Sequence, residues 1–369
     1  MAAGSSRLGI SVVRIEVPFR EPFTTSVGTS RTRESWLVRL RDHHGHTGFG
    51  EIALDPAASR SELEATDRSV RDTVEAVDAG VDLDRLLPEL PATVRAGLDA
   101  ALVGLERTNL GPSPRGPGVR VPVNATIGSG TIEDTVSATR AALAAGFRTL
   151  KLKGGSEASP AELVERLGAV REEAGPLTRL RLDVNGAWDL ETAIEWLKAL
   201  GPLGLEYVEQ PIASSADGRA IADLATLRSG SPTPIGADES VTDLASARAI
   251  VDAGAADVLV VKPARVGGVS VALEIASLAT SAGVGVVLST MLETGIGLAA
   301  GLAVAGSIAD GSMTEPAHGL GTAGLLATDL LEKPLVVEAG TVGTRDLGDL
   351  RVNDEVIRSV TVAAYGMAW

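Results

Sequence analysis

Five charged residues recur at nearly even intervals through the middle of the chain, each at the end of a short apolar strand. They are Lys153 in TLKLK, Asp183 in LRLDVN, Glu209 in LEYVEQ, Asp238 in PIGADES and Lys262 in VLVVKP, at successive intervals of 30, 26, 29 and 24 residues. One strand, one helix and two short loops take roughly 25–30 residues, close to the minimum for a βαβ crossover. The spacing therefore predicts one charged group for each βα unit, at the carboxyl end of its strand.

Strand ends that carry one charged group each favour a closed β/α barrel, because there the carboxyl ends of all strands meet at one mouth. A doubly wound sheet also fits the alternation of strands and helices, but it would not bring five consecutive strand ends to one point. We expect strands near 121–127, 149–153, 180–185, 205–209, 234–238, 258–262 and 284–290, and a weak eighth strand near 313–316.

The helices between these strands carry their own start and stop signals. Thr131 and Asp189 are expected N-caps, since their side-chain oxygens can accept from the first free amides of a helix. A glycine stands just before each of several strands, where a left-handed residue ends a helix. These glycines are Gly146, Gly201, Gly254 and Gly283.

The first 118 residues follow a different pattern, that of a separate α+β domain. Three segments up to about residue 55 have strand composition, and the polar turn His43–His46 joins the last two. Two helices follow, the first predicted to open at Ser61 with Glu64 in a capping box. The Pro/Gly stretch 111–118 is the expected linker, so we predict a cap over 1–118, a barrel over 119–334, and a return of residues from about 335 to 369 to the cap.

Composition excludes several classes of function. With 48 acidic and 33 basic residues the net charge is −15, which would repel nucleic acid and anionic membranes. The chain has no cysteine, which excludes disulfides, thiolate metal sites and cysteine nucleophiles. No uninterrupted apolar segment predicts a signal peptide or a membrane span, so we expect a soluble cytoplasmic protein. A homo-oligomer is compatible with this sequence.

The charged residues at the predicted mouth describe a metal site between two amino groups. Asp183, Glu209 and Asp238 offer hard oxygen donors, which favour Mg²⁺, with Mn²⁺ as the alternative. Glu239 follows Asp238 directly, and the spacing does not decide which of the two ligates. Lysines on opposite sides of such a metal suit removal of a proton next to a carboxylate.

A lysine acts as a base at neutral pH only if its pKa falls well below the ordinary value of ~10.4. Desolvation, a divalent ion and a second lysine all favour the neutral amine, and a pKa of roughly 7–8 would need a shift of about 3 units. Lys151 is one strand pleat away from Lys153 and is the expected source of that second charge.

The motifs K-x-K, D-x-N, VEQP, ADES and KP-x-x-x-GG, in this order, resemble the enolase superfamily and its muconate-lactonizing subgroup. The resemblance implies a (β/α)7β modified TIM barrel with an N-terminal α+β capping domain. It also implies that Lys153 and Lys262 are the acid/base groups and that the three carboxylates bind Mg²⁺. Three further residues are expected to contact these ligands and acid/base groups without binding the metal themselves, namely Lys151, Asn185 and Glu239.

Within the subgroup the segments VLVVKPARVGG, LSTMLETGIGL and EPAHGLGTAGLLATDL are most similar to o-succinylbenzoate synthases of menaquinone biosynthesis. The first two also resemble N-succinylamino acid racemases. Dipeptide epimerases usually carry Asp-x-Asp where this chain has EPAHGLGT, so that alternative is less favoured. Muconate cycloisomerase stays open, and so does a barrel that binds a metal and a carboxylate without turning the ligand over.

The resemblance also directs attention to the loops expected around a small carboxylate substrate. The cap would close the mouth through the loop Glu21–Ser30 and the turn after Glu51. His318 is expected either to contact substrate or to hold its own loop. The full set of expected substrate contacts is Thr24, Thr25, Ser26, Ser289, Thr290, Met291, Glu293 and His318.

Overall fold

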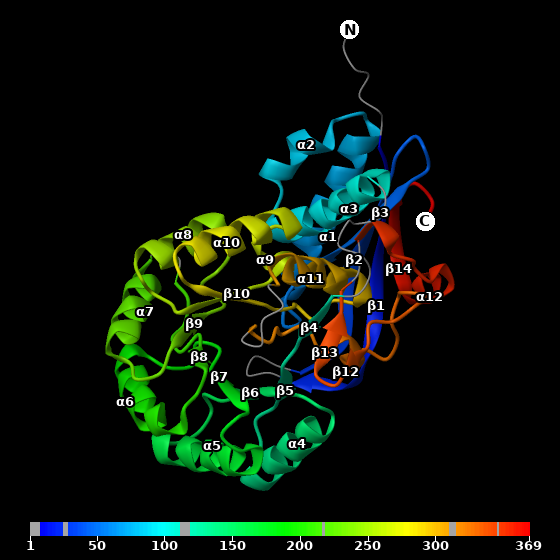
Figure 1. Ribbon diagram of the computed structural model, residues 1–369. Helices are drawn as coiled ribbons and strands as arrows, with labels where there is room; N and C mark the ends of the chain where they lie inside the picture. Colours follow the sequence, from blue (N-terminus) through cyan, green and yellow to red (C-terminus); the bar gives the residue numbers. More distant parts are fainter. Residues whose placement is uncertain (1–7, 25–28, 111–118, 216–217, 310–314, 345–346) are drawn as a thin grey trace.

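The computed structural model describes residues 8–24, 29–110, 119–215, 218–309, 315–344 and 347–369. It contains an antiparallel four-stranded sheet with two long helices against one face, and a curled parallel sheet of seven strands ringed by helices (Figure 1). This is the cap-plus-barrel architecture predicted from the sequence. Among the described helices, none combines the length and apolar character needed to span a lipid bilayer.

The cap sheet has the strand order β14-β1-β2-β3, so the last strand of the chain pairs antiparallel with the first. The apolar faces of its helices α1 and α3 bury Val70, Val74 and Leu98 against Trp36 and Val38 of β2. The cap elements are β1 (Gly9–Thr24), β2 (Thr29–Arg41), β3 (Thr47–Ala53), α1 (Arg60–Asp78), α2 (Leu83–Leu86), η1 (Leu87–Glu89), α3 (Ala92–Leu110), α12 (Asp354–Val360) and β14 (Thr361–Gly366).

The strand β3 and the helix α3 approach each other so closely that only glycine fits between them. A Cβ atom at Gly50 would lie 1.9 Å from the carbonyl oxygen of Gly97, and one at Gly48 would lie 1.9 Å from that of Ala101. The two glycines of GFGE therefore serve the packing of the cap, and they fix the position of Glu51, the next residue along β3.

The barrel sheet is parallel throughout, in the order β11-β10-β9-β8-β7-β6-β5. Its strands are β5 (Ala125–Ile127), β6 (Thr149–Lys153), β7 (Arg179–Asp183), β8 (Tyr207–Glu209), β9 (Ile235–Ala237), β10 (Val258–Val261) and β11 (Gly285–Leu288). The helices around it are α4 (Ile132–Ala144), α5 (Pro160–Ala174), α6 (Leu190–Leu200), α7 (Arg219–Gly230), α8 (Leu244–Asp252), α9 (Pro263–Val266), α10 (Val269–Ser281) and α11 (Gly295–Ile308). Shorter elements are β4 (Arg120–Pro122), η2 (Gly201–Leu203), η3 (Ala323–Leu325), β12 (Val337–Glu338), β13 (Thr341–Gly343) and η4 (Leu347–Asp349).

The gap between β11 and β5 is closed by single-residue bridges from the segment around His318. His318 bridges to Val123 and Gly319 to Ser289, both in parallel orientation. Arg181 of β7 reinforces this segment, because its Nη1 donates to the carbonyl oxygen of Ala317 at 2.7 Å. The pairing residues thus lie after the predicted range 313–316, of which 313–314 are outside the described residues.

Two predicted strand and helix boundaries differ from the structure. The strand expected over 121–127 is divided, because β4 pairs antiparallel with β13 while β5 pairs with β6 in the barrel. The helix expected to open at Ser61 opens two residues earlier, because Ser59 caps α1 and forms a capping box with Glu62. Both serines have a glutamate three residues on, so the local signal alone did not separate them.

The structure confirms most of the other predicted helix N-caps and helix-ending glycines. Thr131 and Asp189 are N-caps of α4 and α6. Three of the four expected glycines have positive φ, but Gly201 has φ −48° and continues into η2. Gly204, three residues later, takes the left-handed conformation with φ 59°. The chain thus makes an extra 3-10 turn before it reverses toward β8.

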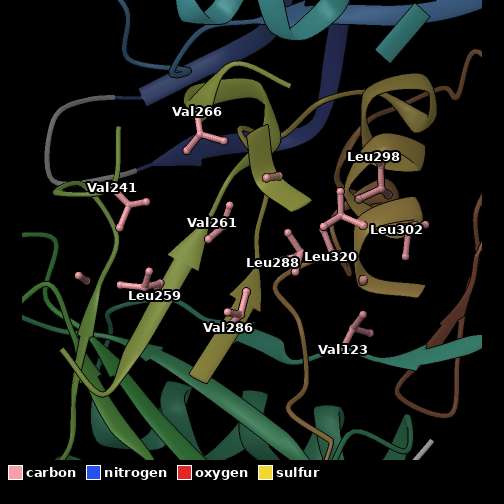
Figure 2. Packing of buried hydrophobic residues seen from close by; sticks show 14 of the residues in the cluster. Val123, Val241, Leu259, Val261, Val266, Val286, Leu288, Leu298, Leu302 and Leu320 are labelled. Atoms are coloured by element: carbon pink, nitrogen blue, oxygen red, sulfur yellow. The ribbon is translucent and has the colours of Figure 1, made fainter. Parts of the chain in front are cut away.

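The main core lies between the barrel wall and its surrounding helices. Figure 2 shows Val261 of β10 and Leu288 of β11 beside Leu298 and Leu302 of α11, with Leu320 of the closing segment between them. In α6 the predicted inner face is buried, and it consists of Ala193, Trp196, Leu197 and Leu200. This packing holds the strand ends, and with them the charged residues, in a fixed frame.

Candidate active site

The charged strand-end residues come together at the carboxyl end of the barrel. Lys153 and Asp183 face each other in register, with Lys153 Nζ 2.6 Å from Asp183 Oδ2. Asp183 in turn pairs with Glu209 of β8. On the other side of the mouth Lys262 Nζ donates to Asp238 Oδ2 at 2.6 Å. The side chains of all three acids are 1% exposed, so this is a buried carboxylate cluster with lysines along it.

Lys151 links the two carboxylates of β7 and β8. Its Nζ lies 2.8 Å from Asp183 Oδ2 and 2.6 Å from Glu209 Oε1. Burial alone would lower the pKa of Lys151, but the charges of Asp183, Glu209 and Asp238 raise it well above its ordinary value. Lys151 therefore stays protonated at neutral pH, as a fixed positive charge one pleat from Lys153.

The three carboxylates differ in pKa because Asp183 and Asp238 each have at least two cations nearby, whereas Glu209 has mainly Lys151. Burial works to raise the pKa of each, yet Lys151 and Lys153 hold that of Asp183 below its usual range, and Lys262 and Arg265 do the same for Asp238. For Glu209, burial and the negative charge of Asp183 outweigh Lys151, so its pKa is raised.

Asp238 is fixed by two residues that were not singled out from the sequence. Arg265 Nη1 donates to Asp238 Oδ1 at 2.7 Å and to its carbonyl oxygen at 3.0 Å. Gln210, with φ 41°, accepts through its Oε1 from the amides of Asp238 and Ser240. The signal was present in both motifs, since Gln210 belongs to VEQP and Arg265 to KPARVGG.

Asn185 and Glu239 form a polar chain that starts at Lys153. Lys153 Nζ donates to Asn185 Oδ1 at 2.8 Å, and Asn185 Nδ2 donates to Glu239 Oε1 at 3.0 Å. Asn185 has φ 49°, a left-handed conformation that asparagine tolerates better than most residues. Burial, followed by the charge of Asp238, raises the pKa of Glu239. Asp238 and Glu239 therefore face different partners, Lys262 and Asn185.

The donor set suits a hard divalent cation, although lysines occupy several of its oxygens. Asp183, Glu209 and Asp238 supply carboxylate oxygens alone, and Glu209 Oε2 is buried with no hydrogen-bond partner in the described part of the chain. No three His, Cys, Asp or Glu side chains among the described residues form a ready-made metal cluster. A cation here would compete with Lys151 for the oxygens that this ammonium group now holds.

The expected substrate contacts fall into two groups. Ser289 and Thr290 follow β11 at the mouth, and Thr290 Oγ1 lies 3.3 Å from Thr322 Oγ1. Met291 packs against Ala53 of the cap. Thr25 and Ser26 lie outside the described residues, and so does the side chain of Thr24.

The other two expected contacts, Glu293 and His318, are held by the protein itself. His318 is 1% exposed, and its Nδ1 accepts from the amide of Leu288 at 3.1 Å. Burial, with a smaller contribution from Arg181, lowers the pKa of His318 to about 4, so the ring is neutral at pH 7. Glu293 is 4% exposed and accepts from the amide of Met291 at 2.8 Å. Both side chains thus hold the loops that carry them.

This arrangement can bring an amino group to each side of a carbon atom held above buried carboxylates. Lys153 reaches the mouth from β6 and Lys262 from the end of β10, with side chains 29% and 12% exposed. A buried positive charge, Lys151, lies beneath the first of them. These are the elements needed to remove a proton from carbon and to stabilise the negative charge that results.

Comparison with known proteins gives concordant matches. A family model described as enolase C-terminal domain-like matches residues 134–348. An o-succinylbenzoate synthase of Thermobifida fusca (strain YX) is 38% identical over 259 residues, which cover 68% of this chain and 76% of the relative.

Two solved structures have similar folds over nearly the whole chain. The muconate lactonizing enzyme of Pseudomonas fluorescens, in complex with muconolactone, is 27% identical with a TM-score of 0.82, and the match covers 97% of this chain and 100% of that one. The L-Ala-D/L-Glu epimerase of Bacillus subtilis is 26% identical with a TM-score of 0.80, over 93% and 98% of the two chains.

Proposed function

The chain belongs to the enolase C-terminal domain-like family, and we propose that it acts as an o-succinylbenzoate synthase. In this reaction a cyclohexadiene carboxylate loses the proton next to its carboxylate and a hydroxide ion, and the aromatic o-succinylbenzoate is formed with water. The observation that carries the proposal is the lysine pair across three buried carboxylates, in a chain 38% identical to such a synthase.

Lys153 is the proposed base, and Lys262 is the proposed cation on the opposite face of the substrate. The amino group of Lys153 takes the proton from the α-carbon and then returns a proton to the departing hydroxide, so one amino group serves both steps of a syn elimination. Lys262 contributes positive charge against the enediolate that forms between those steps. Asp183 and Asn185 hold Lys153 Nζ at 2.6 and 2.8 Å, which fixes the base at the mouth.

Mg²⁺, with Mn²⁺ as the alternative, fits the oxygens of Asp183, Glu209 and Asp238 in this proposal. When bound, the metal supplies positive charge where the substrate carboxylate becomes more negative. Lys151 must then share or release the oxygens of Asp183 and Glu209 that it now contacts. Lys151 also places a positive charge one strand pleat from Lys153, the proposed base.

A second proposal is an isomerase that uses the same residues. The epimerase of Bacillus subtilis and the muconate lactonizing enzyme share the fold at 26% and 27% identity, so racemisation of an N-succinylamino acid, epimerisation of a dipeptide or a cycloisomerisation would need no new architecture. In a racemase both lysines would exchange protons, one on each face of the carbon. A barrel that only binds a carboxylate would gain nothing from two opposed amino groups.

The test is to assay the purified protein with Mg²⁺ on the cyclohexadiene precursor and on N-succinylamino acids, and to follow α-proton exchange in D₂O. We expect dehydration of the precursor. Turnover of the amino acids without dehydration would favour the isomerase, and absence of exchange on both substrates would favour a binding protein.

A further inference from the structure

One carboxylate of the cap reaches across to the barrel and holds the loop between β11 and α11. Glu51 of β3 is 3% exposed. Its Oε2 accepts from Thr294 Oγ1 at 2.6 Å and from the amide of Gly297 at 3.1 Å, and both its oxygens accept from the amide of Thr294. Ser35 of β2 donates to its Oε1 at 2.8 Å, which fixes the carboxylate from the cap side.

The first turn of α11 is thus held by side chains from both directions. Glu51 accepts hydrogen bonds from the amides of Thr294 and Gly297. Asp329, in the segment after η3, accepts one from the amide of Gly295 at 3.1 Å. Thr294 Oγ1 accepts from the amide of Ile296. Carboxylates stabilise a helix start through these free amides and through the helix dipole. Glu51 and Asp329 are therefore two carboxylates that accept from amides at the same helix start. Of the two, only Glu51 belongs to the cap.

The loop that Glu51 holds is strained and lies at the mouth. Leu292 has φ 61°, a left-handed conformation that a residue other than glycine keeps only where the surrounding structure holds it there. Met291, next to it, packs against Ala53 and Ala264, and its sulfur lies 3.8 Å from Arg265 Nη2. Arg265 is the residue that fixes Asp238.

The cap side of this contact also carries a buried positive charge. Arg33 of β2 is 2% exposed, and its Nε and Nη2 have no hydrogen-bond partner within the described ranges. Burial lowers the pKa of Arg33, while Glu51 and then Glu293 oppose this through their charges. Arg33 thus interacts through its charge with Glu51 of the cap and Glu293 of the barrel loop, and more weakly with Asp55 and Glu34.

From these contacts we propose that Glu51 is a positioning residue for substrate, and that the cap uses it to hold the loop 289–294 in its strained, binding-competent form. The inference rests on the proposed function in taking Ser289, Thr290 and Met291 as substrate contacts. It assigns to the final residue of GFGE a role in substrate binding beyond the packing that its glycines serve.

The test compares Glu51→Gln with Asp329→Asn, which removes a carboxylate from the same helix start without touching the cap. In Glu51→Gln an NH₂ group replaces one carboxylate oxygen and cannot accept from the amides of Thr294 and Gly297. The loop should therefore be held less firmly. We expect KM to rise on the order of tenfold with kcat little changed, because a loosened loop loses contacts that bind the substrate and the transition state alike. Asp329→Asn should lower thermal stability to a similar degree and leave KM within about twofold.

Hydrogen exchange of the amides 289–294 gives a readout that does not need turnover. Exchange there should be faster in Glu51→Gln than in Asp329→Asn, and Glu51→Asp should recover part of the protection. If Glu51→Gln does not fold, Glu51→Asp takes its place in the same comparison. Equal exchange and equal KM in the two variants would overturn the proposal. A wild-type protein inactive on the precursor would refute the synthase assignment alone, because the exchange comparison would still stand.

Discussion

Replacing Glu293 by glutamine should make the protein more stable at alkaline pH and flatten its stability profile. Glu293 is 4% exposed, and burial, followed by the charge of Glu51, raises its pKa from 4.5 to about 7. The folded state thus holds this proton more tightly than the unfolded chain. Stability from Glu293 is complete below about pH 4.5 and is lost as the pH rises through about 7.

The size of the effect follows from the difference between the two pKa values. The rise in the pKa of Glu293 from 4.5 to about 7 corresponds to about 3 kcal/mol at full ionisation, of which roughly 2–3 kcal/mol falls between pH 5 and pH 8. Glutamine is neutral at every pH and keeps an oxygen that can accept from the amide of Met291, as Glu293 Oε2 does at 2.8 Å. The variant should therefore match the wild type near pH 4.5 and exceed it by about 3 kcal/mol at pH 8.

The assay is urea denaturation at half-unit intervals from pH 5 to pH 8, at constant ionic strength. The exposed Glu195 of α6, changed to glutamine, controls for the loss of one negative charge. The difference between Glu293→Gln and wild type should grow with pH, whereas the Glu195→Gln difference should stay nearly constant. A Glu293→Gln difference that stays flat or shrinks with pH would mean that the ionised carboxylate is compensated in the fold.

Three further predictions concern the mouth and the cap. Asp183→Asn should lower kcat by on the order of a thousandfold and abolish the response to added Mg²⁺, with an unchanged circular dichroism spectrum; full turnover in chelator-treated buffer would refute the metal site. Lys262→Ala should lower kcat by on the order of 100-fold or more, and α-proton exchange retained on one enantiomer of an N-succinylamino acid would instead indicate two-base chemistry. Gly50→Ala should lose about 3 kcal/mol or more in urea denaturation, because its Cβ would lie 1.9 Å from the oxygen of Gly97. Gly168→Ala in α5, where a Cβ meets nothing within 4 Å, should be neutral or stabilising, and equal losses in both variants would contradict the clash.

Several features of this protein were determined by the sequence alone, because short-range chemistry decides them. A charged residue at the end of an apolar strand, repeated once per βα unit, predicted a barrel and the residues at its mouth. Lys153, Asp183 and Lys262 lie there in the structure. The caps Thr131 and Asp189 were predicted from their own oxygens and the amides that follow. Such signals lie within one helical turn or one strand.

Other features depended on tertiary packing, because the sequence offers more than one local solution. Ser59 and Ser61 each precede a glutamate by three residues, and the helix began at Ser59. Gly201 and Gly204 could each end α6, and the extra turn placed the left-handed residue at Gly204.

The contacts that join the cap to the barrel were also decided by tertiary structure. Glu51 and Thr294 are 243 residues apart, and no local pattern links a cap carboxylate to a barrel helix. Lys151 likewise pairs with Glu209 across 58 residues of chain. Such pairs form only when the core has fixed both elements, since burying a carboxylate or an ammonium group is tolerated only where donors or opposite charges already surround it.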